Sequence, residues 1–127
     1  MVQENKISAV LVSTDLDRAQ RFYEDSVGLT LSAETIKNHL VFECGDGTSL
    51  LVYGRPSGNK ADHTQVRFWT KDIDKDVAAL VANGVEFEEY DTDTFKTVDH
   101  VVTTKGLGRS AWFKDPDGNT IALFQPE

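Results

Sequence analysis

An internal repeat constrains the fold of this chain more than any other feature of its sequence. The two copies match at the start of an amphipathic segment, at the glycine that ends it, and at a later turn. The matching pairs are Asp15 and Asp72, 57 positions apart, Gly28 and Gly84, 56 apart, and the turn glycines Gly47 and Gly118, 71 apart. The second copy therefore has about 14 extra residues (71 minus 57) between its helix and its last turn. A unit this small cannot bury its own sheet face, so the copies are expected to pack together.

The first copy predicts a strand, a helix and three further strands. Lys6–Ser13 is mostly apolar and predicts a buried strand. Thr14 offers a side-chain oxygen as the N-cap of the helix, with Asp17 as its capping-box partner, and Gly28 is placed to end that helix in a left-handed conformation. The strands that follow are expected at Leu29–Thr35, His39–Cys44 and Ser49–Tyr53.

The second copy predicts the same order of elements and ends in a hairpin. Asp72 is the expected N-cap of its helix. In the closing turn Pro116 favours the second position, Asp115 can accept a hydrogen bond from the backbone, and Gly118 accepts a positive φ. The strands are expected at Thr64–Thr70, Val85–Tyr90 and His100–Thr104, and on both sides of the turn within Phe113–Phe124.

These elements predict one α+β domain over residues 1–127. It consists of two tandem βαβββ modules, about 6–54 and 64–126, joined by a polar linker at about 55–63. The eight strands are expected to form one curved sheet, a cup, with the helices on its outer face.

Composition limits the partners that such a domain is expected to have. The net charge is −8, which disfavours nucleic acid and anionic membranes as partners. The single cysteine, Cys44, excludes an internal disulfide and suits a reducing cytoplasm, while no apolar run is long enough to span a bilayer. A cytoplasmic protein without a membrane segment is therefore expected.

Two stretches resemble the vicinal oxygen chelate superfamily, which includes glyoxalase I, bleomycin and fosfomycin resistance proteins, and extradiol dioxygenases. They are the strand-to-helix junction Ser13–Tyr23 and the closing hairpin Phe113–Phe124. The resemblance covers nearly the whole chain and implies the cup-shaped fold, commonly as a homodimer. It does not single out a function, because this fold carries isomerases, dioxygenases, transferases and binding proteins.

Metal-dependent members of the superfamily hold their metal at four pseudo-symmetric positions. The resemblance places these positions on Ser8, Leu51, Gln65 and Ala122. Leu51 and Ala122 have no donor atom, and a serine hydroxyl with one amide oxygen cannot hold a divalent ion. We therefore expect no metal and no other cofactor.

Strand alternation predicts which side chains face the interior of the cup. On the strand at Thr64–Thr70 these are Gln65, Arg67 and Trp69. Trp112 joins them if the closing turn carries a one-residue bulge that sets it opposite Ala122. The candidate ligand-binding residues are Ser8, Tyr53, Gln65, Arg67, Trp69, His100, Trp112 and Phe124. The alternative is that the aromatic side chains only fill a sheet interface or a dimer contact.

Among the polar candidates, Arg67 and His100 give the most specific expectations about what each would bind. A buried Arg67 needs either an acidic side chain such as Glu43 or an anionic group on a ligand. His100 follows Asp99, which strand alternation places on the opposite face, so Asp99 is a poor orienting partner and His100 is expected only as a pocket hydrogen-bonding group. The extra segment 88–109 is expected to form a rim or lid over the cup.

Three functions fit these observations. The first is a metal-free small-molecule binding protein that sequesters a drug or metabolite, as in the bleomycin resistance branch. The second is a glyoxalase-like lyase, isomerase or dioxygenase with a non-standard or absent metal site, including metal-free catalysis through Arg67 and His100. The third is a dimerisation module, and a homodimer is expected under all three.

Overall fold

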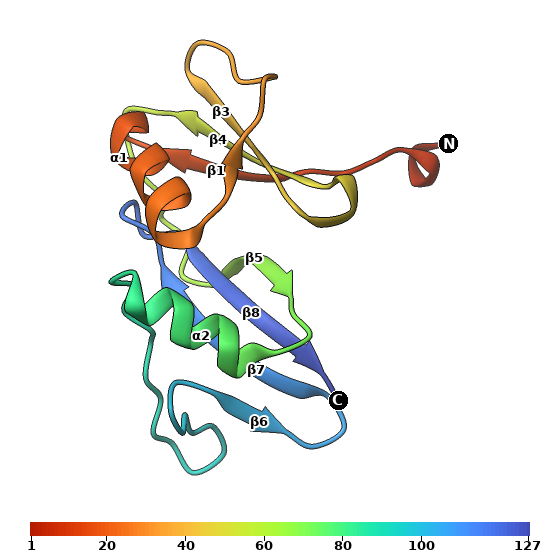
Figure 1. Cartoon of the computed structure of the whole chain (residues 1–127), viewed down its shortest axis with the longest axis vertical. Helices are drawn as coiled ribbons and strands as arrows, with labels where there is room; N and C mark the ends of the chain where they lie inside the picture. Colours follow the sequence, from red (N-terminus) through yellow and green to blue (C-terminus); the bar gives the residue numbers. More distant parts are fainter.

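A computed structural model describes residues 1–127 and contains two four-stranded β-sheets (Figure 1). The first sheet has the strand order β1-β4-β3-β2, in which β1 runs parallel to β4 and the other neighbours are antiparallel. Its strands are β1 (Ala9–Ser13), β2 (Thr30–Leu31), β3 (His39–Glu43) and β4 (Ser49–Gly54).

The second sheet repeats this topology in the order β5-β8-β7-β6. Strand β5 runs parallel to β8, and the other neighbours are antiparallel. Its strands are β5 (Thr64–Trp69), β6 (Val102–Thr104), β7 (Gly108–Lys114) and β8 (Thr120–Pro126). The expected α+β fold with two βαβββ modules is confirmed. The eight strands nevertheless form two sheets rather than one continuous sheet, and the edge strands β1 and β5 approach each other without forming a ladder.

Both main helices begin at the aspartates that define the repeat. α1 (Leu16–Arg21) continues directly into the π-helix η2 (Phe22–Val27), and α2 is Ile73–Ala82. The carboxylate of Asp15 accepts a hydrogen bond from Arg18 N at 3.1 Å, and Asp72 caps α2 in the same way. The expectation that Thr14 is the N-cap was wrong, because its hydroxyl donates to the closing turn instead.

The remaining helical elements are single turns, η1 (Val2–Glu4) and η3 (Gly45–Gly47). No helix combines the length and the apolar character that crossing a membrane requires.

Two strands are shorter than expected, and in one of them a side chain replaces the backbone in part of the ladder. The strand expected at Leu29–Thr35 is only Thr30–Leu31, and beyond it the Thr35 hydroxyl bonds both the N–H and the C=O of Val41. The strand expected at Lys6–Ser13 begins at Ala9. Threonine side chains compete with backbone partners in this way.

The strand expected at Val85–Tyr90 is absent and is represented by a single bridge between Phe87 and Phe113. The backbone N–H of Tyr90 bonds the Thr97 hydroxyl at 3.0 Å, so the chain leaves the sheet there. His100 is likewise outside the strand expected at His100–Thr104, because it lies in a turn with φ +73° and β6 begins at Val102.

One hydrophobic core lies between the helices and both sheets. α1 contacts β4, and α2 contacts β7 and β8. The ring of Phe22 lies 6.2 Å from that of Phe113 in β7, so the helical segment of the first module also packs on the second sheet. The largest fully buried side chains are those of Tyr23, Phe42, Phe113, Leu50, Ile73 and Ile121.

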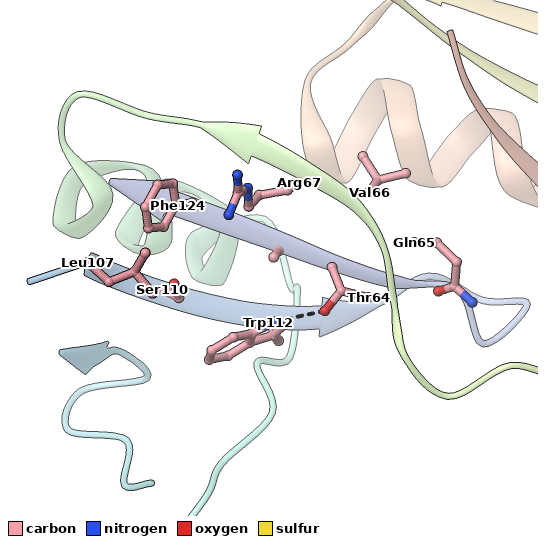
Figure 2. A pocket seen from close by; sticks show the side chains of 9 residues that line it. Thr64, Gln65, Val66, Arg67, Leu107, Ser110, Trp112 and Phe124 are labelled. Carbon is pink, nitrogen blue, oxygen red and sulfur yellow. Dashed lines mark hydrogen bonds between the residues drawn. The ribbon is translucent and has the colours of Figure 1, made fainter. Parts of the chain in front are cut away.

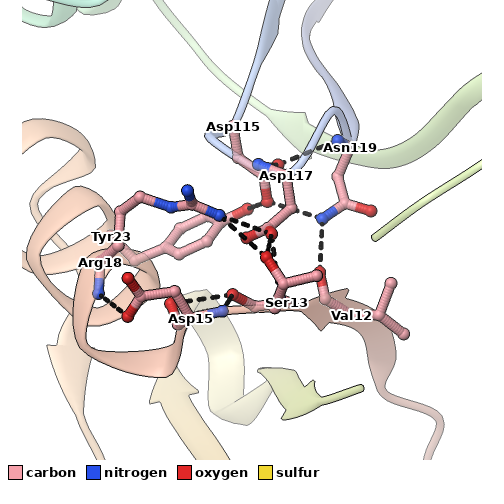
Figure 3. Close-up of polar contacts among 9 residues, drawn as sticks. Val12, Ser13, Asp15, Arg18, Tyr23, Asp115, Asp117 and Asn119 are labelled. Atoms are coloured by element: carbon pink, nitrogen blue, oxygen red, sulfur yellow. Dashed lines mark hydrogen bonds and ion pairs between the residues drawn. The ribbon is translucent and has the colours of Figure 1, made fainter. Parts of the chain in front are cut away.

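A buried polar cluster fastens the first module to the turn between β7 and β8 (Figure 3). One oxygen of Asp115 accepts from the Tyr23 hydroxyl at 2.6 Å and from the Asn119 amide at 2.7 Å. Its other oxygen accepts from the backbone N–H groups of Asp117 and Asn119, both at 2.9 Å. The expected role of Asp115 in the turn is confirmed, and Gly118 has φ +82° as expected.

Asp117 makes a second connection to the first module (Figure 3). Its carboxylate accepts from Thr14 N at 2.9 Å and from the Arg18 guanidinium at 2.8 Å. Burial tends to raise the pKa of Asp117, but hydrogen bonds from Ser13 and Thr14 and the charge of Arg18 outweigh it and hold this pKa below its ordinary value. The modules are thus joined by hydrogen bonds as well as by the core.

Candidate ligand-binding site

The open face of the second sheet contains a row of three residues in register across β5, β8 and β7. Arg67 pairs with Ala122, and Ala122 pairs with Trp112, as the sequence predicts for the closing hairpin. Because Ala122 is small, the row has a long side chain on each side and a hollow between them. The resulting concavity has a volume of about 380 Å³ (Figure 2). It is lined by Thr64, Gln65, Val66, Arg67, Leu107, Ser110, Trp112, Ala122 and Phe124.

Arg67 forms one wall of the concavity and has no acidic partner. Its side chain is exposed and not buried as expected, so water can solvate the charge and no partner is required. Its guanidinium carbon lies 4.5 Å from the ring centroid of Phe124 and 4.8 Å from that of Trp69. The ion pairs of the chain use other residues, and the expected alternative partner Glu43 forms none. Arg67 is therefore held in place by cation–π contacts, and its hydrogen-bond donors remain open.

Trp112 forms the opposite wall, where a hydrogen bond and two aromatic contacts hold its indole. Its indole N–H donates to the Thr64 hydroxyl at 3.1 Å (Figure 2). The rings of Tyr90 and Phe95 lie 5.7 Å and 5.3 Å from it. The indole is thus fixed before any ligand arrives, which lowers the entropic cost of stacking.

Gln65 departs from the expected inward orientation because β5 has a bulge between Thr64 and Val66. Its amide oxygen accepts from Thr120 N at 2.6 Å, and it lies at the end of the concavity, apart from Arg67 (Figure 2). The bulge brings Thr64 into the position that strand alternation assigned to Gln65. The amide nitrogen of Gln65 is buried and has no partner.

The four positions that hold a metal in metal-dependent relatives do not form a metal site here. Ser8 bonds Ser49 at 3.1 Å, Gln65 caps the backbone of Thr120, and Leu51 and Ala122 have no donor atoms. No three His, Cys, Asp or Glu side chains gather anywhere in the chain in a way that could hold an ion. The donor set therefore does not fit a divalent cation.

Four of the eight candidate residues lie outside the concavity, and Ser8, which bonds Ser49, is one of them. Tyr53 stacks on His39 on the open face of the first sheet, with ring centroids 6.1 Å apart. Trp69 is 66% exposed and lines a groove of about 520 Å³ between the modules. His100 bonds Glu89, 11 positions away, and not Asp99.

Sequence reasoning did not identify the contributions of Thr64, Val66, Leu107 and Ser110 to the lining. Ser110 was recoverable, because it lies two residues before Trp112 on β7 and so faces the same side. The bulge that brings in Thr64 and the loop conformation that brings in Leu107 have no comparable signal in the residue types.

No significantly similar protein is found among curated sequences. Solved structures, in contrast, match almost the whole chain. TnmS3, an antibiotic-binding protein from Streptomyces sp. CB03234, is 27% identical with a TM-score of 0.69, over 97% of this chain and 98% of that one. A glyoxalase/bleomycin resistance protein from the same organism is 28% identical with a TM-score of 0.65, over 94% of this chain and all of that one.

A third structure shares the fold at lower sequence identity. The fosfomycin resistance protein FosX from Listeria monocytogenes is 17% identical with a TM-score of 0.72, over 97% of this chain and 91% of that one. The family model described as Glyoxalase/Bleomycin resistance protein/Dioxygenase superfamily matches residues 7–123. With nearly the full length matched, this chain belongs to the Glyoxalase/Bleomycin resistance protein/Dioxygenase superfamily.

Proposed function

We propose that this protein binds a planar small molecule that carries an anionic group, and that it does so without a metal. The observation that carries the proposal is the hollow over Ala122, with Arg67 on one side and Trp112 on the other. Ligand sites are typically concave and mostly apolar, with a few polar groups that converge on the ligand.

The spacing of the walls suits a flat ring. Arg67 and Trp112 are in register on strands separated by one intervening strand, so their Cα atoms are about 10 Å apart. An aromatic ring between them can stack on the indole of Trp112 and under the guanidinium of Arg67. Leucine or glutamate in place of Ala122 would occupy the same space.

The anionic group follows from the open donors of Arg67. A guanidinium presents a planar fork of N–H groups that matches a carboxylate or phosphate, and this one has no acidic side chain beside it. We expect the anion of the ligand to take the place of that missing partner.

The comparisons support small-molecule binding without identifying the molecule. TnmS3 is an antibiotic-binding protein, and it matches this chain over almost its full length. This similarity supports our proposal of a binding protein rather than a metal-dependent enzyme.

Isothermal titration calorimetry with 2-naphthoate and 2-naphthamide tests the proposal. These two compounds share a planar ring system and differ in charge. We expect 2-naphthoate to bind about tenfold more tightly than 2-naphthamide, since a hydrogen bond to a charged group contributes about 1.5–3 kcal/mol. Arg67→Met should remove this preference, while Arg55→Met, which removes a positive charge from the linker, should preserve it.

Two results would count against the proposal. If neither compound binds at millimolar concentration, the concavity is not a site for planar ligands. If both bind the unchanged protein equally well, Arg67 does not select for an anion.

The proposal includes a homodimer, since an apolar face of the first sheet lies uncovered. Val10 is 51% exposed, and Val12, Val41, Leu51 and Tyr53 on the same face are partly exposed. A contiguous apolar face marks a protein contact, and the unpaired edges of β1 and β5 also favour one. We assign a second copy of the chain as the partner, with its open face over this one.

Light scattering coupled to size-exclusion chromatography tests the assembly. We expect twice the mass of one chain, and Val10→Lys should give a single chain because it places a charge in the contact. Lys60→Glu in the linker is a control that changes charge away from this face. A single-chain mass for the unchanged protein would contradict the homodimer.

A further inference from the structure

The extra residues of the second module form a doubled-back segment, residues 88–101, which we call the arm. It leaves the sheet after the bridge between Phe87 and Phe113 and returns just before β6. Within it, Asp91 pairs with Lys96, and Val98 pairs with Val101. The arm therefore has a defined structure of its own at the edge of the second sheet.

The base of the arm is fastened by a network that sequence reasoning did not foresee. One carboxylate oxygen of Glu89 accepts from the Thr97 hydroxyl at 2.6 Å, and the other bonds Nδ1 of His100. The Thr97 hydroxyl also accepts from Tyr90 N at 3.0 Å. The ring of His100 lies 5.7 Å from that of Phe87, which belongs to the hydrophobic core.

The turn that presents His100 is strained. Asp99 and His100 have φ of +50° and +73°, and neither is a glycine. Such conformations cost about 1–3 kcal/mol each and persist only where the surroundings enforce them. The hydrogen bond between His100 and Glu89 and the contact of His100 with Phe87 hold the turn in this conformation.

Two aromatic residues of the arm contact the candidate site. Tyr90 and Phe95 lie 5.1 Å apart and both pack on Trp112. Trp112 thus has the arm on one side and the hollow over Ala122 on the other. The bonds of Thr97 to Glu89 and to Tyr90 connect the fastened base to the ring pair.

We propose that the arm sets the orientation of the Trp112 indole, and that Glu89, Thr97 and His100 are its positioning residues. None of the three lines the concavity. Their effect on Trp112 stands independently, whereas their effect on ligand affinity rests on the proposed function. On this basis they determine how tightly a planar ligand stacks without contacting it.

The test isolates Trp112 by using a Trp69→Phe background, in which it is the only tryptophan. Thr97→Val removes the hydroxyl and retains the shape, Thr97→Ser restores the hydroxyl, and Thr94→Val makes the same change at an exposed arm position without hydrogen bonds of its side chain. We expect Thr97→Val alone to weaken the near-ultraviolet circular dichroism of Trp112 and to raise the Kd of 2-naphthoate about tenfold. Far-ultraviolet circular dichroism should be the same in all three.

Should Thr97→Val fail to fold, Glu89→Ala opens the same network, with Glu86→Ala as its matched control. Identical tryptophan spectra in Thr97→Val and Thr97→Ser would overturn the inference. The spectra need no ligand, so they decide it even if 2-naphthoate does not bind, a result that would count against the proposed function alone. An altered spectrum with an unchanged Kd would overturn the part that concerns affinity.

Discussion

The two sheets have the same topology, yet the side chains on their open faces differ in character. Equivalent rows cross three strands in each sheet, and the internal repeat relates them residue by residue. The row in the first sheet is Val10, Leu51 and Val41, and the row in the second is Arg67, Ala122 and Trp112. Val10 and Arg67 are 57 positions apart, and the other two pairs are 71 apart.

The central residue of each row differs most in size, Leu51 in the first sheet and Ala122 in the second. In the first sheet Leu51 lies between two valines, so the row is entirely apolar. In the second sheet Ala122 leaves the middle empty between a cation and an indole. The strand order is the same in both sheets, so the contrast between the two rows comes from their side chains.

The closing turns of the two sheets differ in how they are hydrogen-bonded. In the first sheet the turn at Gly45–Gly47 is fixed by the exposed Thr48 hydroxyl, which donates to Gly45 O at 2.6 Å. In the second sheet the turn depends on the buried Asp115 and its four hydrogen bonds. One turn only closes a hairpin, whereas the other also holds the two modules together.

The largest expected effect is on this second turn. Asp115→Ala leaves several buried donors without an acceptor and should lower the free energy of unfolding by about 3–5 kcal/mol. Thr48→Ala in the equivalent turn of the first sheet should cost about 1 kcal/mol or less, because water can replace its exposed bond. Urea denaturation followed by circular dichroism measures both. Equal losses would mean that the turn of the second sheet has no special role.

The next largest effect is expected when the sizes of the central residues of the two rows are exchanged. Ala122→Leu fills the hollow and should weaken 2-naphthoate binding by about tenfold or more, since the ring would have to displace about three methyl-sized groups. Leu51→Ala opens the equivalent position in the first sheet and should create no affinity, because no cation or indole flanks it. Calorimetry measures both, with the exposed Ala82→Leu as a control. Unimpaired binding by Ala122→Leu would place the ligand elsewhere.

The repeat allowed much of the fold to be predicted from the sequence. It also contained the information to assign the N-cap of the first helix correctly. Asp72 was assigned correctly as an N-cap, and the offset of 57 points directly to Asp15 for the first helix. Thr14 has the same residue-type preference for an N-cap. Only its contact with Asp117, more than 100 positions away in sequence, explains why it does not cap the helix.

The candidate site was predictable in its register but not in its details. Trp112 was expected opposite Ala122 if the closing turn carried a one-residue bulge, and the two residues do pair. The bulge at Gln65 and the bond between Glu89 and His100 depend on tertiary packing that leaves no local signal in the sequence. Strand alternation also gave His100 no partner, because the residue lies in a turn and not in a strand.

A smaller effect distinguishes a buried tyrosine from an open one. Burial, together with the negative charge of Asp115, raises the pKa of Tyr23. The folded protein therefore keeps this hydroxyl protonated, and stability should fall as pH rises above the unfolded value of about 10. Tyr23→Phe should cost about 1–2 kcal/mol at neutral pH and flatten the alkaline loss. Tyr53→Phe on the open face of the first sheet is the control, and an equal flattening there would contradict this role of Tyr23.

The smallest effect concerns the arm, for which the first module has only a short turn in the equivalent place. Hydrogen bonds from Thr97 and then His100 hold the pKa of Glu89 below its ordinary value. A carboxylate with a lowered pKa stabilises the folded arrangement above the unfolded value of about 4.3, and this contribution is lost as pH falls through the folded-state pKa. In the Trp69→Phe background, we expect the near-ultraviolet signal of Trp112 to weaken on acidification while the far-ultraviolet signal persists. In Thr97→Val the loss should begin at higher pH, because the hydrogen bond that contributes most to lowering this pKa is gone. Simultaneous loss of both signals would mean that the arm has no stability separate from that of the sheets.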